Sequence, residues 1–203
     1  MQIDKKTRIP IWKMIIVIVN IPRLLLHLFV FGVYYNRCEA DVRVNITQRK
    51  YICSIVTAFL YLLVFDKTYR NLFYWRIGKL KYLMWYWLWP HPCFTIATDS
   101  KIGEGMLCLH PFSTIINAEK IGDGFVVLNN VTIGNNKRGE RPTIGENVRV
   151  NANAVVIGKI NIGDNVVIGA GALVNKSVPD NCVVIGNPAY ILKENGKTVK
   201  RSL

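Results

Sequence analysis

Apolar residues recur at every sixth position through the second half of this chain. Three registers of the repeat can be traced, and the longest runs without interruption from residue 144 to residue 174. A short fixed period of this kind indicates an internal repeat and predicts a parallel β-helix. The registers comprise Ile96, Ile102 and Cys108; Leu109, Ile115, Ile121, Val127 and Ile133; and Ile144, Val150, Val156, Ile162, Ile168 and Val174.

A triangular coil explains the period of six. Each coil has three short faces, and one aliphatic side chain per face points inward onto its equivalent in the next coil. The bend between faces favours glycine, asparagine or aspartate, because these residues tolerate a left-handed backbone better than others. As this interpretation requires, glycine follows the aliphatic residue in Ile102-Gly103, Ile121-Gly122, Ile144-Gly145, Ile162-Gly163 and Ile168-Gly169.

The repeat is broken at two places. Its count shifts by one residue between Cys108 and Leu109, next to His110, the only one of the three histidines inside a repeat. A one-residue bulge can turn a side chain out of a regular coil. The second break is the gap between Ile133 and Ile144, where polar and basic turn residues predict a projecting loop over 134–143.

Residues 1–90 lack the six-residue period and favour helices. They combine long apolar stretches with few glycines, and the stretch 66–90, DKTYRNLFYWRIGKLKYLMWYWLWP, predicts a helix that ends before Pro90. The chain therefore divides into an apolar, basic helical region over 1–90, a β-helix over 91–192 and a basic, weakly structured tail over 193–203. We expect a mainly β fold in which α-helices precede the β-helix.

Basic charge is concentrated in the helical region. Residues 1–90 carry 14 basic and 4 acidic side chains, a net charge of +10, whereas residues 91–203 carry 12 and 9, a net charge of +3. A basic region this apolar and aromatic suits an anionic membrane surface better than a nucleic acid, for which no binding motif is present. Two interpretations stay open: a buried helical core, or helices that lie in the membrane interface.

Neither a signal peptide nor a spanning helix is expected. The apolar stretch from Ile11 is interrupted by Lys13, Asn20, Pro22 and Arg23, and the other apolar stretches are shorter than the roughly 20 residues that span a bilayer. The five cysteines are scattered and form no CxxC pair, which favours buried reduced thiols and a cytoplasmic location, including the inner face of the cytoplasmic membrane. No cluster of cysteine and histidine has the spacing of a metal site.

The repeat region resembles a known family of enzymes. The stretches IGEGMLCLHPFSTIINAEKIGDGFVVLNNVTIG, PTIGENVRVNANAVVIGKINIGDNVVIGAGALVNKSVP and VVIGNPA resemble the hexapeptide-repeat acyltransferases. Within that family they resemble the serine acetyltransferase-like branch, which includes enzymes that O-acetylate sugars of surface polysaccharides. The resemblance covers residues 93–192. It implies a left-handed parallel β-helix, a homotrimer with active sites in clefts between subunits, and acetyl-CoA as the donor without a metal.

His110 matches the general base of this family. In serine acetyltransferases a histidine closes a glycine-containing stretch, and the matching stretch here, GEGMLCLH, ends at His110. A hydroxyl is a weak nucleophile towards a thioester at neutral pH, and a neutral imidazole can take its proton during the attack. The same base then returns a proton to the departing thiolate.

Other family features are replaced in this chain. Serine acetyltransferases have an upstream acidic residue that orients the histidine, and alignment places Thr95 there, with Asp99 nearby. Arg141 stands where their second histidine lies in the projecting loop. Because the features tied to serine are absent, we expect a sugar hydroxyl as the acceptor. Asp99, Asn117 or a backbone carbonyl are the candidates to orient His110.

The resemblance also implies where acetyl-CoA binds. Its pantetheine arm is expected beside small residues of successive coils, which match Ala152 and Ala170, because a bulky side chain would block the backbone amides. Gly134 and Asn135 begin the projecting loop next to the expected thioester, and Lys176 is placed to contact a CoA phosphate. The ordinary alternative is that the alanines serve only tight corners and that Lys176 is a solvated surface lysine.

Three functions are compatible with these observations. The first is an acetyl-CoA-dependent O-acetyltransferase that acts on a sugar or lipid-linked glycan in surface or capsular polysaccharide biosynthesis. The second is a serine O-acetyltransferase of cysteine biosynthesis, and the third is a non-catalytic β-helix scaffold at the membrane. The expected partners are two further copies of the chain in a homotrimer and a membrane surface contacted peripherally through residues 1–90.

Overall fold

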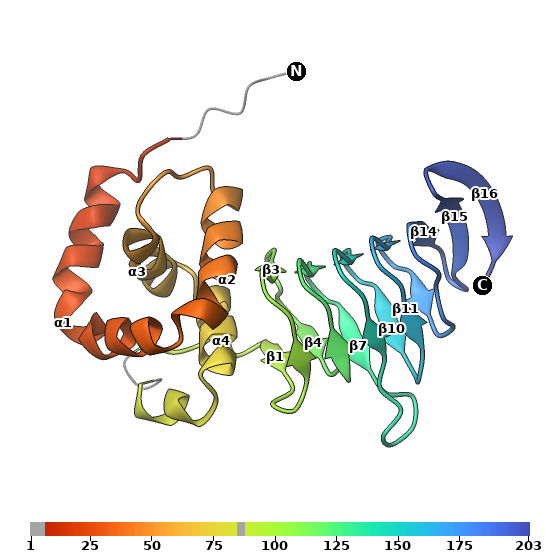
Figure 1. The fold of residues 1–203 in the computed structure, drawn as a ribbon, viewed down its shortest axis with the longest axis horizontal. Helices are drawn as coiled ribbons and strands as arrows, with labels where there is room; N and C mark the ends of the chain where they lie inside the picture. Colours follow the sequence, from red (N-terminus) through yellow and green to blue (C-terminus); the bar gives the residue numbers. More distant parts are fainter. Residues whose placement is uncertain (1–6, 85–87) are drawn as a thin grey trace. The chain divides into compact units, whose positions relative to one another are not determined.

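The computed structural model of the chain describes residues 7–84 and 88–203, which form two compact units. The first, up to His91, is helical, and the second, from Pro92, is a β-helix (Figure 1). This arrangement confirms the predicted mainly β fold with a helical region before it. Residues 85–87 of the helix predicted over 66–90 lie outside the described residues.

Four α-helices and one 3-10 helix build the helical unit. They are α1 (Ile11–Val33), α2 (Tyr35–Gln48), α3 (Ile55–Phe65), α4 (Lys67–Arg76) and η1 (Gly78–Leu83). The single helix predicted over 66–90 is therefore wrong, because α4 ends at Arg76. Gly78 supplies the reason: its φ of +60° is the left-handed conformation in which α-helices commonly end.

Helix α3 forms the centre of the helical unit. Residues 58–63 are all buried, and Phe59 stacks on Phe31 of α1 with ring centroids 4.0 Å apart. Side chains cap the starts of α3 and α4: the Ser54 hydroxyl accepts from the Thr57 amide, and the Asp66 carboxylate accepts from the first amides of α4. The apolar stretches of residues 1–90 thus do build a helical core.

Helix α1 is longer than the sequence pattern predicted. It runs through Pro22 for 23 residues, and by length and mean hydropathy (2.2) it could cross a membrane. The expectation that no apolar stretch reaches spanning length was wrong for this segment. Proline removes one backbone donor and can bend a helix, and α1 changes direction midway along its length in Figure 1, as Pro22 would cause.

The β-helix consists of three sheets of short strands. Sheet I contains β1 (Phe94–Ile96), β4 (Thr114–Ile116), β7 (Thr132–Gly134), β10 (Val155–Ile157) and β13 (Leu173–Val174). Sheet II contains β2 (Lys101–Ile102), β5 (Lys120–Ile121), β8 (Thr143–Ile144) and β11 (Asn161–Ile162). Sheet III contains β3 (Leu107–Cys108), β6 (Val126–Val127), β9 (Arg149–Val150), β12 (Val167–Ile168), β14 (Cys182–Ile185), β15 (Tyr190–Glu194) and β16 (Lys197–Ser202).

The longest predicted register is confirmed as the core of the β-helix. All six of its residues are buried, and those on each sheet stack on equivalents one coil away, as Ile144 does on Ile162. The preceding register is wrong at Ile115, which is 51% exposed, whereas Ile116 is 0% exposed. The six-residue period alone does not indicate which of the adjacent residues Ile115 and Ile116 points into the core. The choice depends on how many residues the preceding corner contains.

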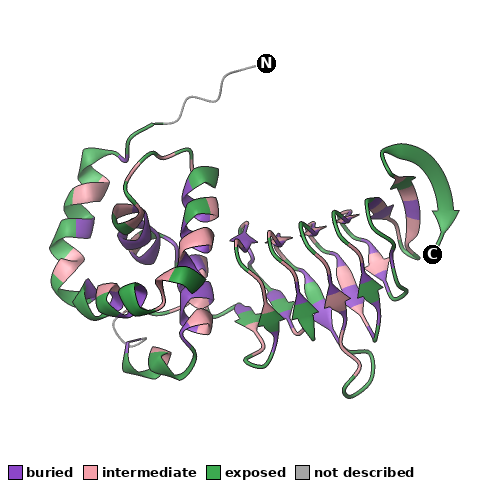
Figure 2. Ribbon diagram, in the orientation of Figure 1, coloured by how far each residue is buried: buried purple, intermediate pink, exposed green. Residues whose placement is uncertain are grey.

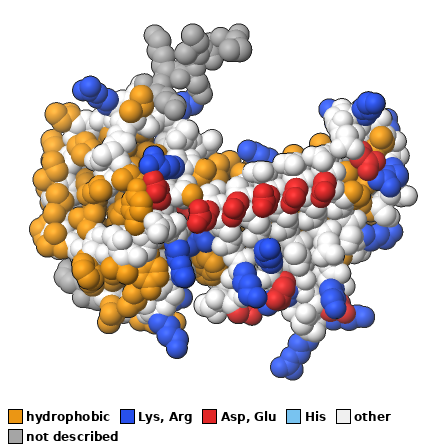
Figure 3. All heavy atoms as spheres, in the orientation of Figure 1, with side chains coloured by type: hydrophobic (Ala, Val, Ile, Leu, Met, Phe, Trp, Pro, Cys, Tyr) orange, Lys and Arg blue, Asp and Glu red, His pale blue; other side chains and the backbone are white. Residues whose placement is uncertain are grey.

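Glycines allow successive coils to approach closely at the corner between sheets II and III. A Cβ built on Gly122 would lie 2.7 Å from the backbone of Gly145 in the next coil. Carboxylates follow the glycines, and Asp123, for example, accepts from the Glu104 amide at 2.7 Å. A row of acidic side chains runs along the β-helix in Figure 3. This corner is therefore specified by glycine and aspartate together.

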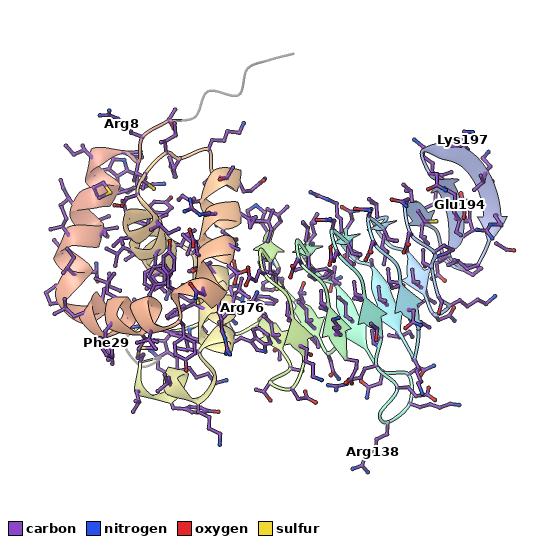
Figure 4. The ribbon with its side chains drawn as sticks, viewed as in Figure 1. Arg8, Phe29, Arg76, Arg138, Glu194 and Lys197 are labelled. Atoms are coloured by element: carbon purple, nitrogen blue, oxygen red, sulfur yellow. The ribbon has the colours of Figure 1, made fainter. Side chains whose placement is uncertain are left out.

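The C-terminal end differs from the weakly structured tail predicted over 193–203. Strands β15 and β16 form an antiparallel pair that extends sheet III, and Figure 4 labels Glu194 and Lys197 in this hairpin. Alternation of polar and apolar residues is weak here, so pairing of the backbone rather than burial holds β16. The five cysteines, all among the described residues, form no disulfide bond; Cys38, Cys108 and Cys182 are buried, whereas Cys93 is exposed.

Candidate active site

His110 lies at the corner where the chain passes from sheet III to sheet I. Five residues, 109–113, separate the inward-pointing Cys108 and Thr114. One coil later, three residues separate the inward-pointing Val127 and Val131. The shift in the repeat is thus an insertion of two residues at this corner, rather than the single residue that the count indicated.

The inserted residues give His110 an unusual backbone. Its φ is +50°, a left-handed conformation that costs a residue with a Cβ about 1–2 kcal/mol. Ser113, with φ +56°, occupies the ordinary left-handed position of the corner, matched by Asn130 and Asn153 in the next coils. His110 is therefore an additional left-handed residue. Non-glycine residues in this conformation concentrate at functional sites.

The imidazole of His110 faces outward from the coil. His110 is exposed, and among the described residues its ring makes no hydrogen bond, whereas its backbone carbonyl accepts from the Phe112 amide at 2.6 Å. Two large apolar side chains lie near it in the sequence and are also exposed: Phe112 at 59% and Ile115 at 51%. In a single copy of the chain, this histidine and two apolar side chains close to it in the sequence are therefore exposed to solvent.

The same corner brings Ala152 and Ala170 into line with His110. We call this column of corners, residues 109–113, 128–130, 151–153 and 169–171, the His110 edge. Backbone hydrogen bonds connect successive corners: the Asn130 amide donates to the Phe112 carbonyl at 2.7 Å, and the Gly171 amide donates to the Ala152 carbonyl at 2.9 Å. The small residues thus leave a backbone ladder accessible along the edge that starts at His110.

Arg141 lies at the opposite edge of sheet I and forms hydrogen bonds with several residues there. We call this edge, which contains residues 97–100, 117–119, 135–142 and 175–177, the loop edge. The Arg141 guanidinium donates to Asp99 at 2.7 Å and to Glu119 at 2.6 Å, and it lies 3.4 Å from the Asn117 amide oxygen. The hydrogen bond to Glu119 is the main cause that raises the pKa of Arg141. The loop is thereby fastened to two neighbouring coils, and its tip carries Arg138 (Figure 4).

The predicted orienting residues do not meet His110 within one chain. Asp99 and Asn117 belong to the loop edge and contact Arg141, so sheet I separates them from the His110 edge. Thr95 is exposed on β1, where it pairs with Ile115 of β4. The sequence did not point to Glu119 as a partner of Arg141. Its position could have suggested the contact, because Glu119 is the equivalent of Ser100 in the next coil and so lies beside the projecting loop.

The remaining predicted CoA-binding residues also lie on or beside the loop edge. The Asn135 amide oxygen accepts from Asn117 at 2.8 Å, and Gly134 precedes it at the end of β7. A Cβ on Gly134 would meet nothing within 4 Å, so packing does not require glycine there. The Lys176 ammonium donates to the Leu203 backbone carbonyl at 2.7 Å. The ten predicted site residues therefore fall into two groups on opposite edges of one sheet, with Thr95 between them.

A groove of about 540 Å³ lies elsewhere, along sheet II. It is lined by side chains such as Lys101, Lys120 and Glu146, and none of the predicted site residues lines it. Within residues 7–84 and 88–203, no group of three or more histidine, cysteine, aspartate or glutamate residues is placed to hold a metal ion.

Comparison with known proteins places the repeat in context. The family described as bacterial transferase hexapeptide (six repeats) matches residues 141–176. The serine acetyltransferase of Bacillus pumilus is 36% identical over 113 residues, which cover 56% of this chain and 51% of that protein. The chain thus spans about half the length of this relative.

Solved structures resemble a larger part of the chain. The crystal structure of Neisseria gonorrhoeae serine acetyltransferase has a TM-score of 0.62 at 27% identity and covers 85% of this chain and 68% of its own. Serine acetyltransferase from Brucella abortus in complex with coenzyme A has a TM-score of 0.65 at 22% identity, covering 88% of this chain and 74% of its own. The fold class, a left-handed parallel β-helix preceded by helices, is confirmed.

Proposed function

Since residues 93–192 resemble the hexapeptide-repeat acyltransferases of the serine acetyltransferase branch, we propose that this protein is an acetyl-CoA-dependent O-acetyltransferase with His110 as its general base. One observation carries the proposal. A two-residue insertion places a left-handed, exposed histidine at the start of the accessible backbone ladder beside Ala152 and Ala170. A structural histidine would need neither the insertion nor the strained backbone.

The chemistry assigned to His110 balances without a further reactant. The neutral imidazole takes the proton of the acceptor hydroxyl as its oxygen attacks the thioester carbonyl. The carbon–sulfur bond then breaks, and the imidazolium returns the proton to the thiolate of CoA. Ala152 and Ala170 leave room for the pantetheine arm along the His110 edge, in keeping with the coenzyme A bound by the Brucella abortus neighbour.

A homotrimer with shared sites is part of the proposal. The two groups of site residues lie on opposite edges of sheet I, so a cleft between neighbouring copies would place one copy's His110 edge against the other's loop edge. The exposed side chains of Phe112 and Ile115 support this arrangement, because apolar surface of this kind is commonly covered by a partner. Arg141, Asn135 and Lys176 would then reach the acceptor and CoA from the neighbouring copy.

Serine is the first acceptor that we propose, because the named relatives are serine acetyltransferases. This changes the preference for a sugar that the sequence alone favoured. A sugar hydroxyl stays as the second candidate on one specific observation. Arg141 is already paired with two carboxylates, which leaves it less available to bind the carboxylate of an amino acid.

Release of free CoA thiol from acetyl-CoA tests the proposal. We expect release with serine or with a glycan hydroxyl, and a loss of about 10²–10⁴-fold in kcat for His110→Asn. Asparagine tolerates the left-handed backbone, so this variant keeps the corner folded. Equal inertness of wild type and variant on serine and on a panel of capsular oligosaccharides would instead support the non-catalytic scaffold.

A further inference from the structure

Helix α1 bends midway in Figure 1, and both of its halves carry exposed apolar side chains on their outer side. Before the bend, Ile15 and Val19 are 56% and 72% exposed; after it, Leu25 and Phe29 are 60% and 70% exposed. Each pair has the four-residue spacing that brings side chains onto one side of a helix. Figure 2 shows the exposed residues on this side, and Figure 3 shows apolar side chains gathered over the helical unit. We define the α1 stripe as Ile11, Trp12, Ile15, Ile18, Val19, Leu25, Leu26, Phe29 and Val33.

The opposite side of α1 is fastened to the helical unit near both ends. Val17, Leu24 and Phe31 are buried in its core. The Lys13 ammonium donates to the Tyr61 hydroxyl at 3.1 Å, and the His27 ring lies 3.0 Å from the Tyr74 hydroxyl. A helix packed along one side in this way cannot be surrounded by lipid, so α1 is suited to lie along a membrane rather than to cross it.

The described part of the helical unit carries more exposed basic than acidic side chains. Each carboxylate described in the helical unit pairs with an arginine: Glu39 with Arg43, Asp41 with Arg76, and Asp66 with Arg49. Five further basic side chains of the described unit are exposed and make no ion pair with a described carboxylate: Arg8, Arg23, Arg37, Lys67 and Lys79. The unit therefore presents apolar surface together with free positive charge.

Segment η1 repeats the same combination. Leu80, Tyr82 and Leu83 are exposed, and Lys79 and Lys81 alternate with them. Basic residues beside exposed aromatic and aliphatic side chains are typical of surfaces that lie at lipid headgroups. Trp12 and Trp89, exposed at 56% and 72%, add the side chain most enriched at that depth.

We propose that the α1 stripe inserts in the plane of an anionic lipid bilayer and holds the protein peripherally at its surface. The apolar stripe supplies burial at the headgroup boundary, and the unpaired lysines and arginines supply attraction to anionic lipid. A second copy of this chain fits the stripe less well, because it would bring two positively charged units together. This inference does not depend on the proposed acetyltransferase activity.

Sedimentation of the full-length protein with lipid vesicles tests the inference. We expect binding to phosphatidylcholine vesicles that contain phosphatidylglycerol to exceed binding to phosphatidylcholine alone by roughly tenfold, and to weaken with added salt. The double variant Ile15→Gln/Phe29→Gln is expected to lower binding by at least about tenfold. Its matched control, Ile52→Gln/Val199→Gln, removes two exposed apolar side chains outside α1 and should bind as wild type does.

Three further measurements distinguish a peripheral helix from a misfolded variant, a spanning helix and a dimer interface. Circular dichroism spectra identical to wild type exclude misfolding of the variants. Release of bound protein by alkaline carbonate supports a peripheral helix, whereas retention would show a spanning one and overturn the inference. Protein that stays in the supernatant with anionic vesicles overturns it as well. Light scattering that shows a dimer dissociated by the double variant would assign the stripe to a second copy.

Discussion

At the scale of single residues, left-handed backbone positions distinguish structural corners from the candidate site. Most corners of the β-helix use asparagine or glycine there, as at Asn130, Asn153 and Gly171. Those residues adopt the conformation with little strain. His110 does not belong to that group, since it occupies an extra left-handed position that only its own corner has. The residue type and the backbone together therefore distinguish His110 as a candidate functional residue.

A second histidine, His27, is buried in the helical unit, and we predict that it makes the stability of this unit sensitive to acid. His27 is buried, and loss of solvation lowers the pKa of its imidazole from 6.5 to about 4. Because the folded chain binds this proton less readily than the unfolded chain, its stabilising effect is complete above about pH 6.5. This stabilisation is lost as the pH falls from 6.5 towards 4. The free energy of unfolding is expected to decrease by roughly 3 kcal/mol over this range.

Urea unfolding followed by the helical circular dichroism signal measures this effect. His27→Leu should remove this part of the pH dependence, and Tyr74 keeps a partner because its hydroxyl donates to the Leu88 carbonyl at 3.1 Å. If wild type and variant lost stability in parallel between pH 6.5 and pH 4, the assignment to His27 would be wrong.

At the scale of elements, the coils are fixed by how closely their backbones approach. The carboxylates of Asp123 and Asp164 each accept a hydrogen bond from a backbone amide of the preceding coil. The distance between nitrogen and oxygen is 2.7 Å in both cases. That contact leaves no room for a side chain on the glycines beside it. The recurrent aliphatic-glycine pairs thus serve the stacking of strands as well as the bend between them.

Gly122→Ala is predicted to destabilise the β-helix by about 1–3 kcal/mol, because the new methyl group would overlap backbone atoms. Chemical denaturation of the β-helix measures the change. Gly134→Ala is the matched control, since its methyl group would meet nothing within 4 Å and should leave stability nearly unchanged. Similar losses in both variants would mean that intrinsic backbone preference, and not the approach of coils, sets the glycine requirement.

At the scale of the whole molecule, the candidate site is divided between two edges. His110 with Ala152 lies on one edge of sheet I, and Arg141 with Asn135 lies on the other. A single flat sheet holds these edges apart, so no rotation of side chains can bring them together. We therefore propose that another copy of the chain supplies the second edge.

Light scattering is expected to give three times the chain mass for the wild-type protein. Phe112→Glu would place a charge in the interface that we propose and should shift the protein towards smaller species, with loss of CoA-releasing activity. Val199→Gln, an exposed apolar position on β16, serves as the control and should stay trimeric. A monomeric wild type with full activity would exclude the shared site.

Several structural features could be predicted from the sequence because they depend on local repetition. The register from Ile144 to Val174 has one inward aliphatic residue per face, so its burial follows from the period alone. The projecting loop followed from its length and polarity. The choice between Ile115 and Ile116 could not be predicted, since it depends on the two residues inserted at the His110 corner and on the shorter corner after Ile116.

The sequence by itself determined the β-helix, the helical region before it, the loop and the place of His110 at a break in the repeat, because each depends on spacing and residue type along the chain. Only the tertiary structure decided which residues share an edge. It showed that Arg141 forms hydrogen bonds with Asp99, Asn117 and Glu119. It also placed His110 in the same column of corners as Ala152 and Ala170. The physical reason is that coils stack residues from successive turns, so neighbours in the site are far apart in the chain.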